Sequence, residues 1–321
     1  MRILLVKTSS LGDVIHNLPV VSDLHLRFPD AQIDWCVEES FADIPRLHPA
    51  VDQVIPVATR RWRRSLGRMS TWREMDDFRR RIGAREYTAV LDTQGLLKSA
   101  LIARQANGVH WGYAAEAARE AIAARFYDAT FVIPWNVHAV QRNRWLAAAA
   151  FDYPVDLPLD YGISAPAVDS TWIPEQRLAV LLTATSRDEK LWDDDRWSAV
   201  ARALRERGLR PILPSGNALE RARAERIANE IADAVVAPPL TLPQVADLIA
   251  RASLAIGVDT GLAHLAAALH VPVIALYVAT EPALTGVCGT GFVRNLGGIG
   301  APPSVDTVLK ATEQALLRCP A

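Results

Sequence analysis

Cysteine is scarce in this sequence. The 321 residues include three cysteines, Cys36, Cys288 and Cys319, and their spacing is that of neither a disulfide framework nor a zinc site. Disulfides persist mainly in oxidising compartments, so this composition fits a reducing one. We therefore expect no disulfide and no bound structural metal.

Long hydrophobic runs are also missing. No stretch approaches the roughly 18 consecutive apolar residues of a membrane span, so any membrane contact is expected to be peripheral. The opening residues, MRILLVKTSSLGD, hold an apolar run too short for the core of a signal peptide, and polar residues and glycine follow at once. This run predicts a buried first strand.

The chain has no large excess of either charge. Its 35 Lys and Arg against 36 Asp and Glu give a net charge of -1, which argues against a general nucleic-acid binder. One dense basic run is nevertheless present, at Arg60, Arg61, Arg63 and Arg64 around Trp62. A solvated charged face is the usual explanation of such a run. The tryptophan and the near-neutral total favour an anionic partner here, because arginine binds phosphates and carboxylates bidentately.

Short apolar runs alternate with helical runs along most of the chain. We predict strands over 2–7, 33–37, 54–57, 89–92, 178–183, 210–213, 234–237, 254–258 and 271–277. We predict helices over 14–27, 196–207, 219–231, 242–252, 262–269 and 304–317. This rhythm is typical of α/β domains with doubly wound parallel sheets.

The length of the chain favours two domains, because a single hydrophobic core rarely grows this large. A Pro- and Asp-rich passage, Tyr153–Pro166, interrupts the alternation and predicts the boundary. We expect domains over 1–160 and 161–303, and a final helix within 304–321 that could return to the first domain. Ligands of open α/β sheets bind beyond the carboxyl ends of the strands, so functional residues are expected in the strand-to-helix loops.

The first such loop contains Ser10 and Asp13. Small residues and Gly12 allow backbone N–H groups at the start of the next helix to face a ligand. Asp13 has two interpretations of equal weight: a helix N-cap, a role that aspartate often fills, or a general base that takes a proton from an attacking hydroxyl.

The second domain has a similar junction at Asp259-Thr260-Gly261, where amide groups at a helix start could bind a diphosphate. A turn capped by Asp259 is an equally good explanation. Lys190 lies in a loop rich in hydroxyls and could pair with a phosphate, or be an ordinary surface lysine. Glu220, at another helix start, could bind a ribose diol, although such a glutamate is more often a partner of the helix dipole.

Together these segments resemble one known family, the ADP-heptose:lipopolysaccharide heptosyltransferases, over essentially the whole chain. The resemblance rests on the order and spacing of Lys7–Asp13, Val54–Val57, Arg60–Arg63, Asp92, Gln94–Leu96, Lys98–Ser99, Thr185, Arg187–Asp188, Lys190, Asp259–Leu262 and His264–Leu265. The Arg-Trp-Arg and Gln-Gly-Leu segments are similar to those of transferases that add the first heptose.

The resemblance implies a GT-B fold, in which two Rossmann-like doubly wound domains face a central cleft. It implies an inverting glycosyltransferase that moves heptose from ADP-L-glycero-β-D-manno-heptose to a Kdo residue of Kdo2-lipid A, without a cofactor, in lipopolysaccharide inner-core synthesis. It also implies a cytoplasmic enzyme, peripheral on the anionic cytoplasmic face of the inner membrane, with no nucleic-acid partner.

The resemblance assigns roles to individual residues. Asp13 would be the catalytic base, and Lys190 would stabilise the leaving diphosphate. Donor contacts are implied for Thr185, Ser186, Lys190, Glu220, Leu240, Asp259, Thr260, Gly261 and His264. Acceptor contacts are implied for Ser10, Arg60, Arg61, Arg63, Arg64, Gln94, Lys98, Arg119 and His138.

Two departures and several alternatives remain at this point. Tyr277-Val278-Ala279-Thr280 replaces the family's more usual Tyr-Gly-Pro-Thr, and Ser215 stands where relatives often carry tryptophan. The alternatives are a transferase for a later core heptose, a transferase with another nucleotide sugar, a nucleotide-sugar epimerase, and a non-catalytic protein that binds anionic glycolipids. Retention of Asp13, Lys190 and Asp259 argues against the last.

Overall fold

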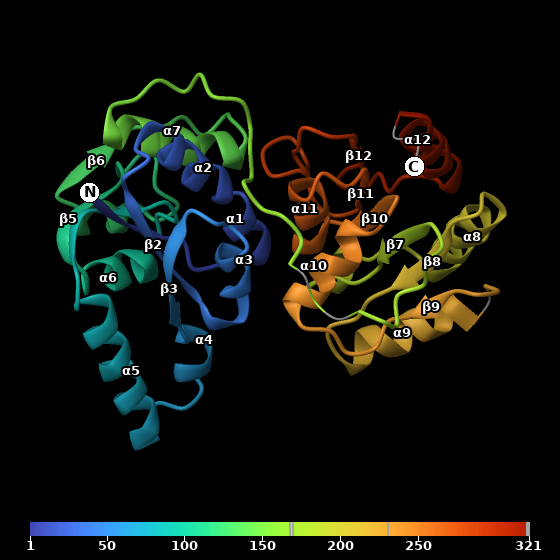
Figure 1. Cartoon of the computed structure of the whole chain (residues 1–321), viewed down its shortest axis with the longest axis horizontal. Helices are drawn as coiled ribbons and strands as arrows, with labels where there is room; N and C mark the ends of the chain where they lie inside the picture. Colours follow the sequence, from blue (N-terminus) through green and yellow to red (C-terminus); the bar gives the residue numbers. More distant parts are fainter. Residues whose placement is uncertain (167, 169, 230, 319–321) are drawn as a thin grey trace. The chain divides into compact units, whose positions relative to one another are not determined.

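The chain folds into two compact α/β units, Met1–Ile163 and Ser164–Ala321, each built on its own six-stranded sheet (Figure 1). The boundary therefore falls between Ile163 and Ser164, where the sequence predicts it at 160/161. The structure, a computed structural model, describes residues 1–166, 168, 170–229 and 231–318, so Cys319 lies outside the described residues.

The sheet of the first unit is entirely parallel, in the order β3-β2-β1-β4-β5-β6. Its strands are β1 (Arg2–Val6), β2 (Gln32–Glu38), β3 (Val51–Val57), β4 (Glu86–Asp92), β5 (Asn107–Tyr113) and β6 (Ala129–Phe131). The first four are the predicted ones. β5 was not predicted because two glycines and His110 interrupt its apolar residues, and β6 was not predicted because it has three residues.

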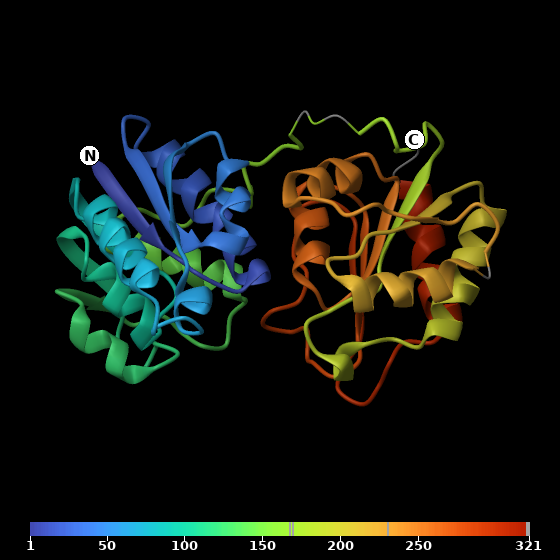
Figure 2. The ribbon, with the colours of Figure 1, turned by 90° about the horizontal axis from the view of Figure 1, so that it is seen from below.

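Helices cover both faces of this sheet (Figure 2). They are α1 (Leu11–Ile15), α2 (Leu18–Arg27), α3 (Asp43–Arg46), α4 (Thr59–Trp62), α5 (Met69–Ile82), α6 (Leu97–Ala103) and α7 (Ala139–Phe151), with short 3-10 helices η1 (Glu39–Phe41) and η2 (Ala121–Phe126). On one face α5 and α6 contact β3, β1 and β4, while α2 and α7 pack together on the other side, where α7 contacts β5 and β6.

The single helix predicted over 14–27 is in fact two helices. α1 ends at Ile15, and α2 begins at Leu18 after the N-cap Asn17. Pro19 lies in the first turn of α2, where its missing N–H costs nothing because that group has no intrahelical partner. The prediction of one continuous helix was wrong because apolar periodicity continues across the break.

The sheet of the second unit is also parallel, in the order β12-β11-β10-β7-β8-β9. Its strands are β7 (Leu178–Leu182), β8 (Arg210–Leu213), β9 (Val235–Val236), β10 (Leu254–Val258), β11 (Val273–Tyr277) and β12 (Val293–Gly297). Numbered within each unit, both sheets have the strand order 3-2-1-4-5-6 of nucleotide-binding Rossmann folds. β12 was not predicted because this edge strand is only partly buried and carries Arg294 and Asn295.

The helices of the second unit are η3 (Asp188–Lys190), α8 (Asp194–Glu206), α9 (Ala218–Asn229), α10 (Leu242–Ala250), α11 (Gly261–Ala268) and α12 (Val305–Arg318). The last of these is the helix predicted within 304–321. α12 contacts α8 and strands β10 to β12, and Val308, Ala311 and Ala315 belong to the core of the second unit. Its apolar stripe is thus used within the second unit, to which α12 belongs.

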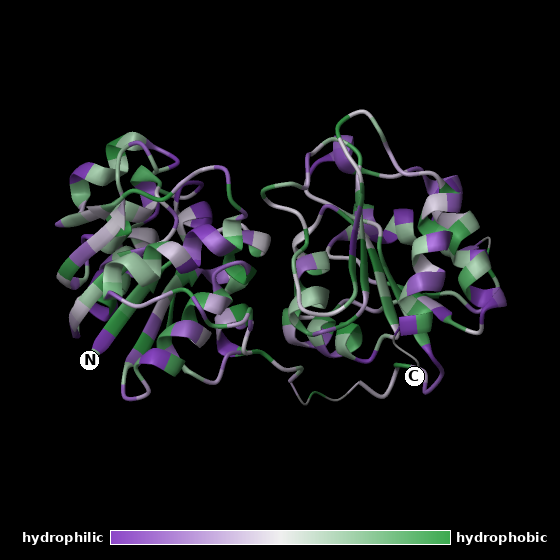
Figure 3. Cartoon of the chain, turned by 90° about the horizontal axis from the view of Figure 1, so that it is seen from above, coloured by the Kyte–Doolittle hydropathy of each residue, from purple (hydrophilic) through white to green (hydrophobic). Residues whose placement is uncertain are grey.

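The strands of each sheet contribute to the hydrophobic core of its unit, and the polar loops follow the strand ends. Strand ribbons in both units are largely hydrophobic, whereas helices alternate hydrophobic and hydrophilic residues (Figure 3). Each sheet changes direction of winding between its two central strands, β1 and β4 in the first unit and β7 and β10 in the second. Loops at the carboxyl ends of these strands separate and leave a ligand site, so functional residues are expected in these four loops.

Candidate active site

Asp13 follows β1 at the winding switch point of the first unit. It is the third residue of α1, not its N-cap, and Ser10 is the N-cap. The Asp13 Oδ2 atom accepts hydrogen bonds from the Ser10 backbone N–H at 3.0 Å and from the Ser10 hydroxyl at 3.1 Å. Capping and chemistry are therefore not exclusive alternatives, because one carboxylate oxygen caps the helix and the other remains for a different role.

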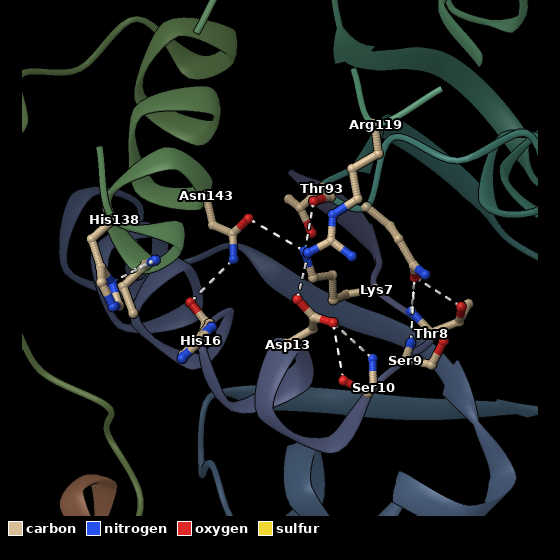
Figure 4. Close-up of polar contacts among 12 residues, drawn as sticks. Lys7, Thr8, Ser9, Ser10, Asp13, His16, Thr93, Arg119, His138 and Asn143 are labelled. Atoms are coloured by element: carbon tan, nitrogen blue, oxygen red, sulfur yellow. Dashed lines mark hydrogen bonds and ion pairs between the residues drawn. The ribbon is translucent and has the colours of Figure 1, made fainter. Parts of the chain in front are cut away.

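The second oxygen of Asp13 pairs with a cation. Arg119 Nη2 lies 2.7 Å from Oδ1, in a carboxylate whose side chain is 17% exposed (Figure 4). Burial by itself would raise the pKa of Asp13, but the charges of Lys7 and Arg119 and the hydrogen bonds from Ser10 and Arg119 outweigh it and hold the pKa well below its usual range. Asp13 is therefore ionised at neutral pH and can accept a proton.

Lys7 is a residue of this site that the sequence analysis did not assign. It is 3% exposed at the end of β1, and its ammonium group donates to the Thr93 carbonyl at 2.8 Å and to Asn143 Oδ1 at 3.4 Å (Figure 4). Burial lowers the pKa of Lys7 to about 8, against the opposing attraction of Asp13. A lysine directly after a buried strand and before a polar loop was the available sequence signal.

Gln94 supports this loop from beneath. Its Oε1 atom accepts from the Thr8 backbone N–H at 2.6 Å, from the Thr8 hydroxyl at 2.8 Å and from the Ser9 N–H at 3.3 Å. Only 2% of its surface is exposed. The buried amide thus joins the loops after β1 and β4 and supports the loop of Ser10 and Asp13, while its interpretation as an acceptor contact stays a prediction.

The basic run lies over α4 and the loop before α5. Its positive charge acts on Lys98. Burial lowers the pKa of Lys98, and the charges of Arg60 and Arg63 add to the effect. Lys98 Nζ is 3.5 Å from the Ser9 hydroxyl, next to the loop of Asp13. Lys98 is therefore close enough to Arg60 and Arg63 to be affected by their charges, and it lies next to the loop of Asp13.

Arg61 differs from the other arginines of the run. Its guanidinium binds both oxygens of Glu39 at 3.0 Å and Glu74 at 2.6 Å, and so ties η1 to α5. Among the described residues, Arg60, Arg63 and Arg64 have no carboxylate within ion-pair distance. Arg61 is thus engaged in holding the segment, whereas its neighbours present their charge.

His138 lies at the start of α7 rather than on the basic surface. Its Nδ1 accepts from the Val140 backbone N–H at 3.2 Å, which makes it the N-cap, and its ring contacts that of His16 edge to face (Figure 4). Asn143, one turn further along α7, donates to the carbonyl of His16 at 3.2 Å. His138 therefore borders the Asp13 site through α1 and α7.

The second unit places Asp259 at its own switch point, after β10. Its carboxylate accepts from the ammonium of Lys190 and from the hydroxyl of Thr280 at 2.6 Å, while the Thr185 hydroxyl donates to its backbone carbonyl at 2.9 Å. Burial alone would raise the pKa of Asp259, but the hydrogen bonds from Lys190 and Thr280 outweigh it and lower the pKa. Three loops thus converge on one ionised carboxylate.

The other predicted donor residues lie in α11 and at its start, in the loop of Lys190, and before α10. Thr260 is the N-cap of α11, Gly261 is its first residue, and His264 is buried within this helix. Ser186 is exposed in the loop of Lys190, and Leu240 is half-buried before α10. The first amides of α11 lack intrahelical partners, as a diphosphate site requires.

Glu220 is already occupied by its own loop. Its carboxylate accepts from the Gly216 backbone N–H and from the Asn217 side chain, both at 2.7 Å. The sequence interpretation as a ribose contact remains a prediction. In this structure Glu220 fixes the turn between β8 and α9.

Arg223 is a supporting residue that sequence reasoning missed. It is 9% exposed, and its guanidinium donates to the carbonyls of Thr183 and Trp192, at the two ends of the loop that carries Lys190, and to Asp194 at 2.7 Å. The loop is therefore clamped at both ends. An arginine on a helix face gave no signal of this role, because its partners are backbone carbonyls distant in sequence.

Neither a metal-binding cluster nor a membrane-spanning helix occurs in the part of the chain that the structure describes. The described residues contain no group of three or more His, Cys, Asp or Glu side chains arranged to hold a metal ion. No helix in this part of the chain is long and apolar enough to cross a membrane.

Two units, each with a parallel six-stranded sheet and polar loops at its switch point, are the architecture of GT-B type proteins, which the solved heptosyltransferases share. The chain belongs to the family described as glycosyltransferase family 9 (heptosyltransferase), which residues 75–308 match. The whole-chain resemblance to heptosyltransferases is thereby confirmed.

Similarity to individual proteins extends over nearly all of the chain. It is 44% identical over 296 residues to lipopolysaccharide heptosyltransferase 1 of Pseudomonas aeruginosa, covering 92% of this chain and 83% of that one. The Escherichia coli heptosyltransferase WaaC with ADP has 39% identity and a TM-score of 0.91, covering 98% and 100% of the two chains. WaaC with ADP-2-deoxy-2-fluoro heptose has 38% identity and a TM-score of 0.88, covering 98% and 99%.

Proposed function

We propose that this glycosyltransferase moves heptose from ADP-heptose to a Kdo residue of Kdo2-lipid A, at the cytoplasmic face of the inner membrane. The observation that carries the proposal is Asp13, an ionised carboxylate held after β1 by Ser10 and Arg119. The similarity to lipopolysaccharide heptosyltransferase 1 and to WaaC with ADP and a fluorinated ADP-heptose supports the choice of donor.

The proposed reaction is a single inverting displacement. A hydroxyl oxygen of the acceptor attacks the anomeric carbon of heptose, the bond from that carbon to the diphosphate breaks with its electron pair, and Asp13 accepts the hydroxyl proton. Asp13 Oδ1 accepts only the Arg119 bond among the described residues, and a carboxylate oxygen has two lone-pair sites, so one remains for the acceptor hydroxyl. Its low pKa makes it a weak base, which suits a proton transfer that follows bond formation.

The second unit would stabilise the departing ADP. We assign the Lys190 ammonium and the amides at the start of α11 to the diphosphate, whose negative charge grows as the glycosidic bond breaks. We assign the basic surface of Arg60, Arg63, Arg64 and Lys98 to the carboxylates and phosphates of the acceptor. No cofactor is required in this scheme.

The direct test is turnover of ADP-heptose by the purified protein with defined acceptors. We expect ADP release and a mass increase of one heptose with Kdo2-lipid A. Transfer only to an acceptor that already carries heptose would favour a later core transferase, and binding of Kdo2-lipid A without turnover would favour a non-catalytic glycolipid-binding protein. Either of these results would contradict the proposal.

The acceptor assignment predicts a selective effect of three arginines. Replacing Arg60, Arg63 and Arg64 by glutamine should raise the KM for Kdo2-lipid A by about 10-fold or more, because several charge-assisted hydrogen bonds act together. The KM for ADP-heptose should change little. A two-substrate kinetic matrix measures both, and raising the salt concentration should weaken acceptor use by the wild type more than by the variant.

Arg61→Gln is the matched control, because it removes one charge from the same run. Arg61 already pairs with Glu39 and Glu74, and exposed ion pairs contribute about 0–1 kcal/mol, so the variant should lose little stability and little acceptor affinity. Equal increases in both KM values for the triple variant would show that the run is an ordinary solvated charged face. An Arg61→Gln effect as large as that of the triple variant would show the same.

A further inference from the structure

The segment between β3 and the middle of α5 combines exposed apolar side chains with unbalanced positive charge. Residues 59–73 include six arginines and no aspartate or glutamate. Leu66, Met69 and Trp72, here named the arm tip, are 49%, 72% and 51% exposed. Figure 1 shows that α4 and α5 project from the sheet and that the loop joining them, with the first turn of α5, lies at the far end.

The arm tip has a defined local structure. The Thr71 hydroxyl donates to the Ser65 carbonyl at 2.8 Å, and the Ser65 hydroxyl contacts the Arg61 carbonyl at 3.0 Å. The loop that presents the apolar side chains is therefore closed on itself by hydrogen bonds. A preformed loop loses less conformational entropy when it binds than a flexible one.

The polar N–H group of Trp72 is already hydrogen-bonded within the protein, which suits the indole ring to a medium of low polarity. Its indole N–H donates to the Leu66 carbonyl at 2.9 Å, within the arm tip itself. An indole ring that enters an apolar phase with an unpaired N–H would incur a desolvation penalty, which this bond removes. The exposed ring thus carries no polar group that needs water.

The base of the arm shows that the exposed apolar residues are not a displaced part of the core. Trp62 packs edge to face on Phe78 with ring centroids 5.8 Å apart, and its N–H donates to Glu74 at 2.9 Å. Both rings belong to the core beneath β1 and β3. The core is complete without the arm tip, so its three side chains are free to meet a partner.

The surrounding charge identifies the kind of partner. The cations next to the arm tip have no carboxylate within ion-pair distance among the described residues: Arg63, Arg64, Arg68 and Arg73. Apolar side chains ringed by unpaired arginines complement a surface that is anionic outside and apolar a few ångströms below. An anionic lipid bilayer has this profile, and tryptophan is favoured at its interface.

We propose that the arm tip inserts into the headgroup region of an anionic bilayer while the surrounding arginines bind lipid phosphates. This inference rests on the proposed function, because a lipid acceptor places the enzyme at a membrane. It goes further by naming three apolar residues as the inserted element. Three side chains reach only the interface, so binding is shallow and reversible.

Vesicle flotation tests the contribution of the apolar residues. The probe is a vesicle of roughly equal parts phosphatidylethanolamine and phosphatidylglycerol without any Kdo lipid. The variant Leu66→Ser/Met69→Ser/Trp72→Ser should partition about 10- to 100-fold more weakly than the wild type, because it loses three buried apolar groups and no charge. Equal binding of the variant and the wild type would overturn insertion and leave adsorption by arginine alone.

A matched control removes equally exposed apolar residues elsewhere. Leu26, Leu101 and Leu317 are 58%, 47% and 81% exposed on α2, α6 and α12. Their triple replacement by serine should leave vesicle binding within about twofold of the wild type, because they lie outside the proposed contact. An equal loss in this control would show that any reduction in surface hydrophobicity weakens binding, and would also overturn the proposal.

Tryptophan quenching separates insertion from adsorption. Vesicles with brominated acyl chains should quench part of the wild-type fluorescence, and Trp72→Phe should lose that part while it still binds. Identical quenching in both proteins would overturn insertion of Trp72. Concentration-dependent dimers that the serine variant abolishes, without vesicle binding by the wild type, would identify a protein contact instead.

The two proposals can fail separately. The serine variant should transfer heptose to a deacylated, water-soluble Kdo acceptor at the wild-type rate, because Leu66, Met69 and Trp72 are assigned no contact with sugar. If the wild type transfers no heptose to any acceptor but shows tip-dependent vesicle binding, the proposed function fails and the membrane contact stands. If the wild type transfers heptose but its vesicle binding does not depend on the arm tip, the proposed function stands and the membrane contact fails.

Discussion

Asp13→Asn is expected to slow heptose transfer by about 10²- to 10⁴-fold, the usual effect of losing a general base. Asparagine has nearly the same shape and can still accept the Ser10 hydrogen bonds at the start of α1, but its amide cannot take a proton. The loss should appear in kcat with little change in the KM for ADP-heptose. Steady-state kinetics with Kdo2-lipid A measures it.

The stability of the Asp13→Asn variant provides an internal check. The pKa of Asp13 is lower in the folded protein than its ordinary value of 3.8, so the carboxylate stabilises the fold above pH 3.8 and this contribution is lost as the pH falls further. The variant should therefore be less stable than the wild type at pH 7, and the difference should shrink below pH 3.8. Urea unfolding at several pH values measures this difference.

Arg119→Gln distinguishes the base from the ion pair, because it removes the same contact at 2.7 Å and keeps the carboxylate. We expect this variant to retain much more turnover than Asp13→Asn. A loss of kcat as large as that of Asp13→Asn would show that the pair, and not proton transfer, is what the reaction needs. Near wild-type turnover of Asp13→Asn would remove the catalytic assignment altogether.

The strands that the sequence predicted share one physical property. β1, β7 and β10 are buried along nearly their whole length, so a continuous apolar run marks each of them. β6 and the edge strand β12 are only partly buried, and their pairing is decided by neighbouring strands that are distant in sequence. The packing of α12 on α8 and on β10 to β12 was not predictable for a similar reason, because most of these partners are distant in sequence.

The candidate site likewise has residues that the sequence predicts and contacts that it does not. Asp13, Lys190 and Asp259 could be found because each follows a strand end, where parallel sheets bind ligands. Which atoms they contact could not be found, because the partners come from other loops: Arg119 lies 106 residues from Asp13, and Lys190 lies 69 residues from Asp259. The bonds that Gln94 makes to Thr8 and Ser9 were not predictable for this reason, since an amide in a ligand loop looks the same in sequence whether it faces outward or supports the loop.

Lys190→Ala is expected to reduce kcat/KM by about 10²- to 10³-fold, in the range seen when one preorganised group at a developing charge is removed. In the free site the Lys190 ammonium pairs with Asp259, which also binds Thr280. Removing the lysine therefore leaves an ionised carboxylate close to the diphosphate that is leaving. Repulsion should add to the lost attraction, and both are largest in the transition state, so ADP affinity measured by calorimetry should fall much less than kcat/KM.

A double-mutant cycle can test whether repulsion from Asp259 contributes to the Lys190→Ala defect. If part of the Lys190→Ala defect is repulsion from Asp259, then Lys190→Ala/Asp259→Asn should be more active than Lys190→Ala alone. Arg187→Ala is the matched control, since Arg187 is an exposed cation of the same loop and already pairs with Glu189 at 2.9 Å. It should change kcat/KM by less than about threefold. An equal fall in ADP affinity and kcat/KM, or additive effects in the cycle, would make Lys190 a binder of the ground state and would leave the leaving group to the amides of α11.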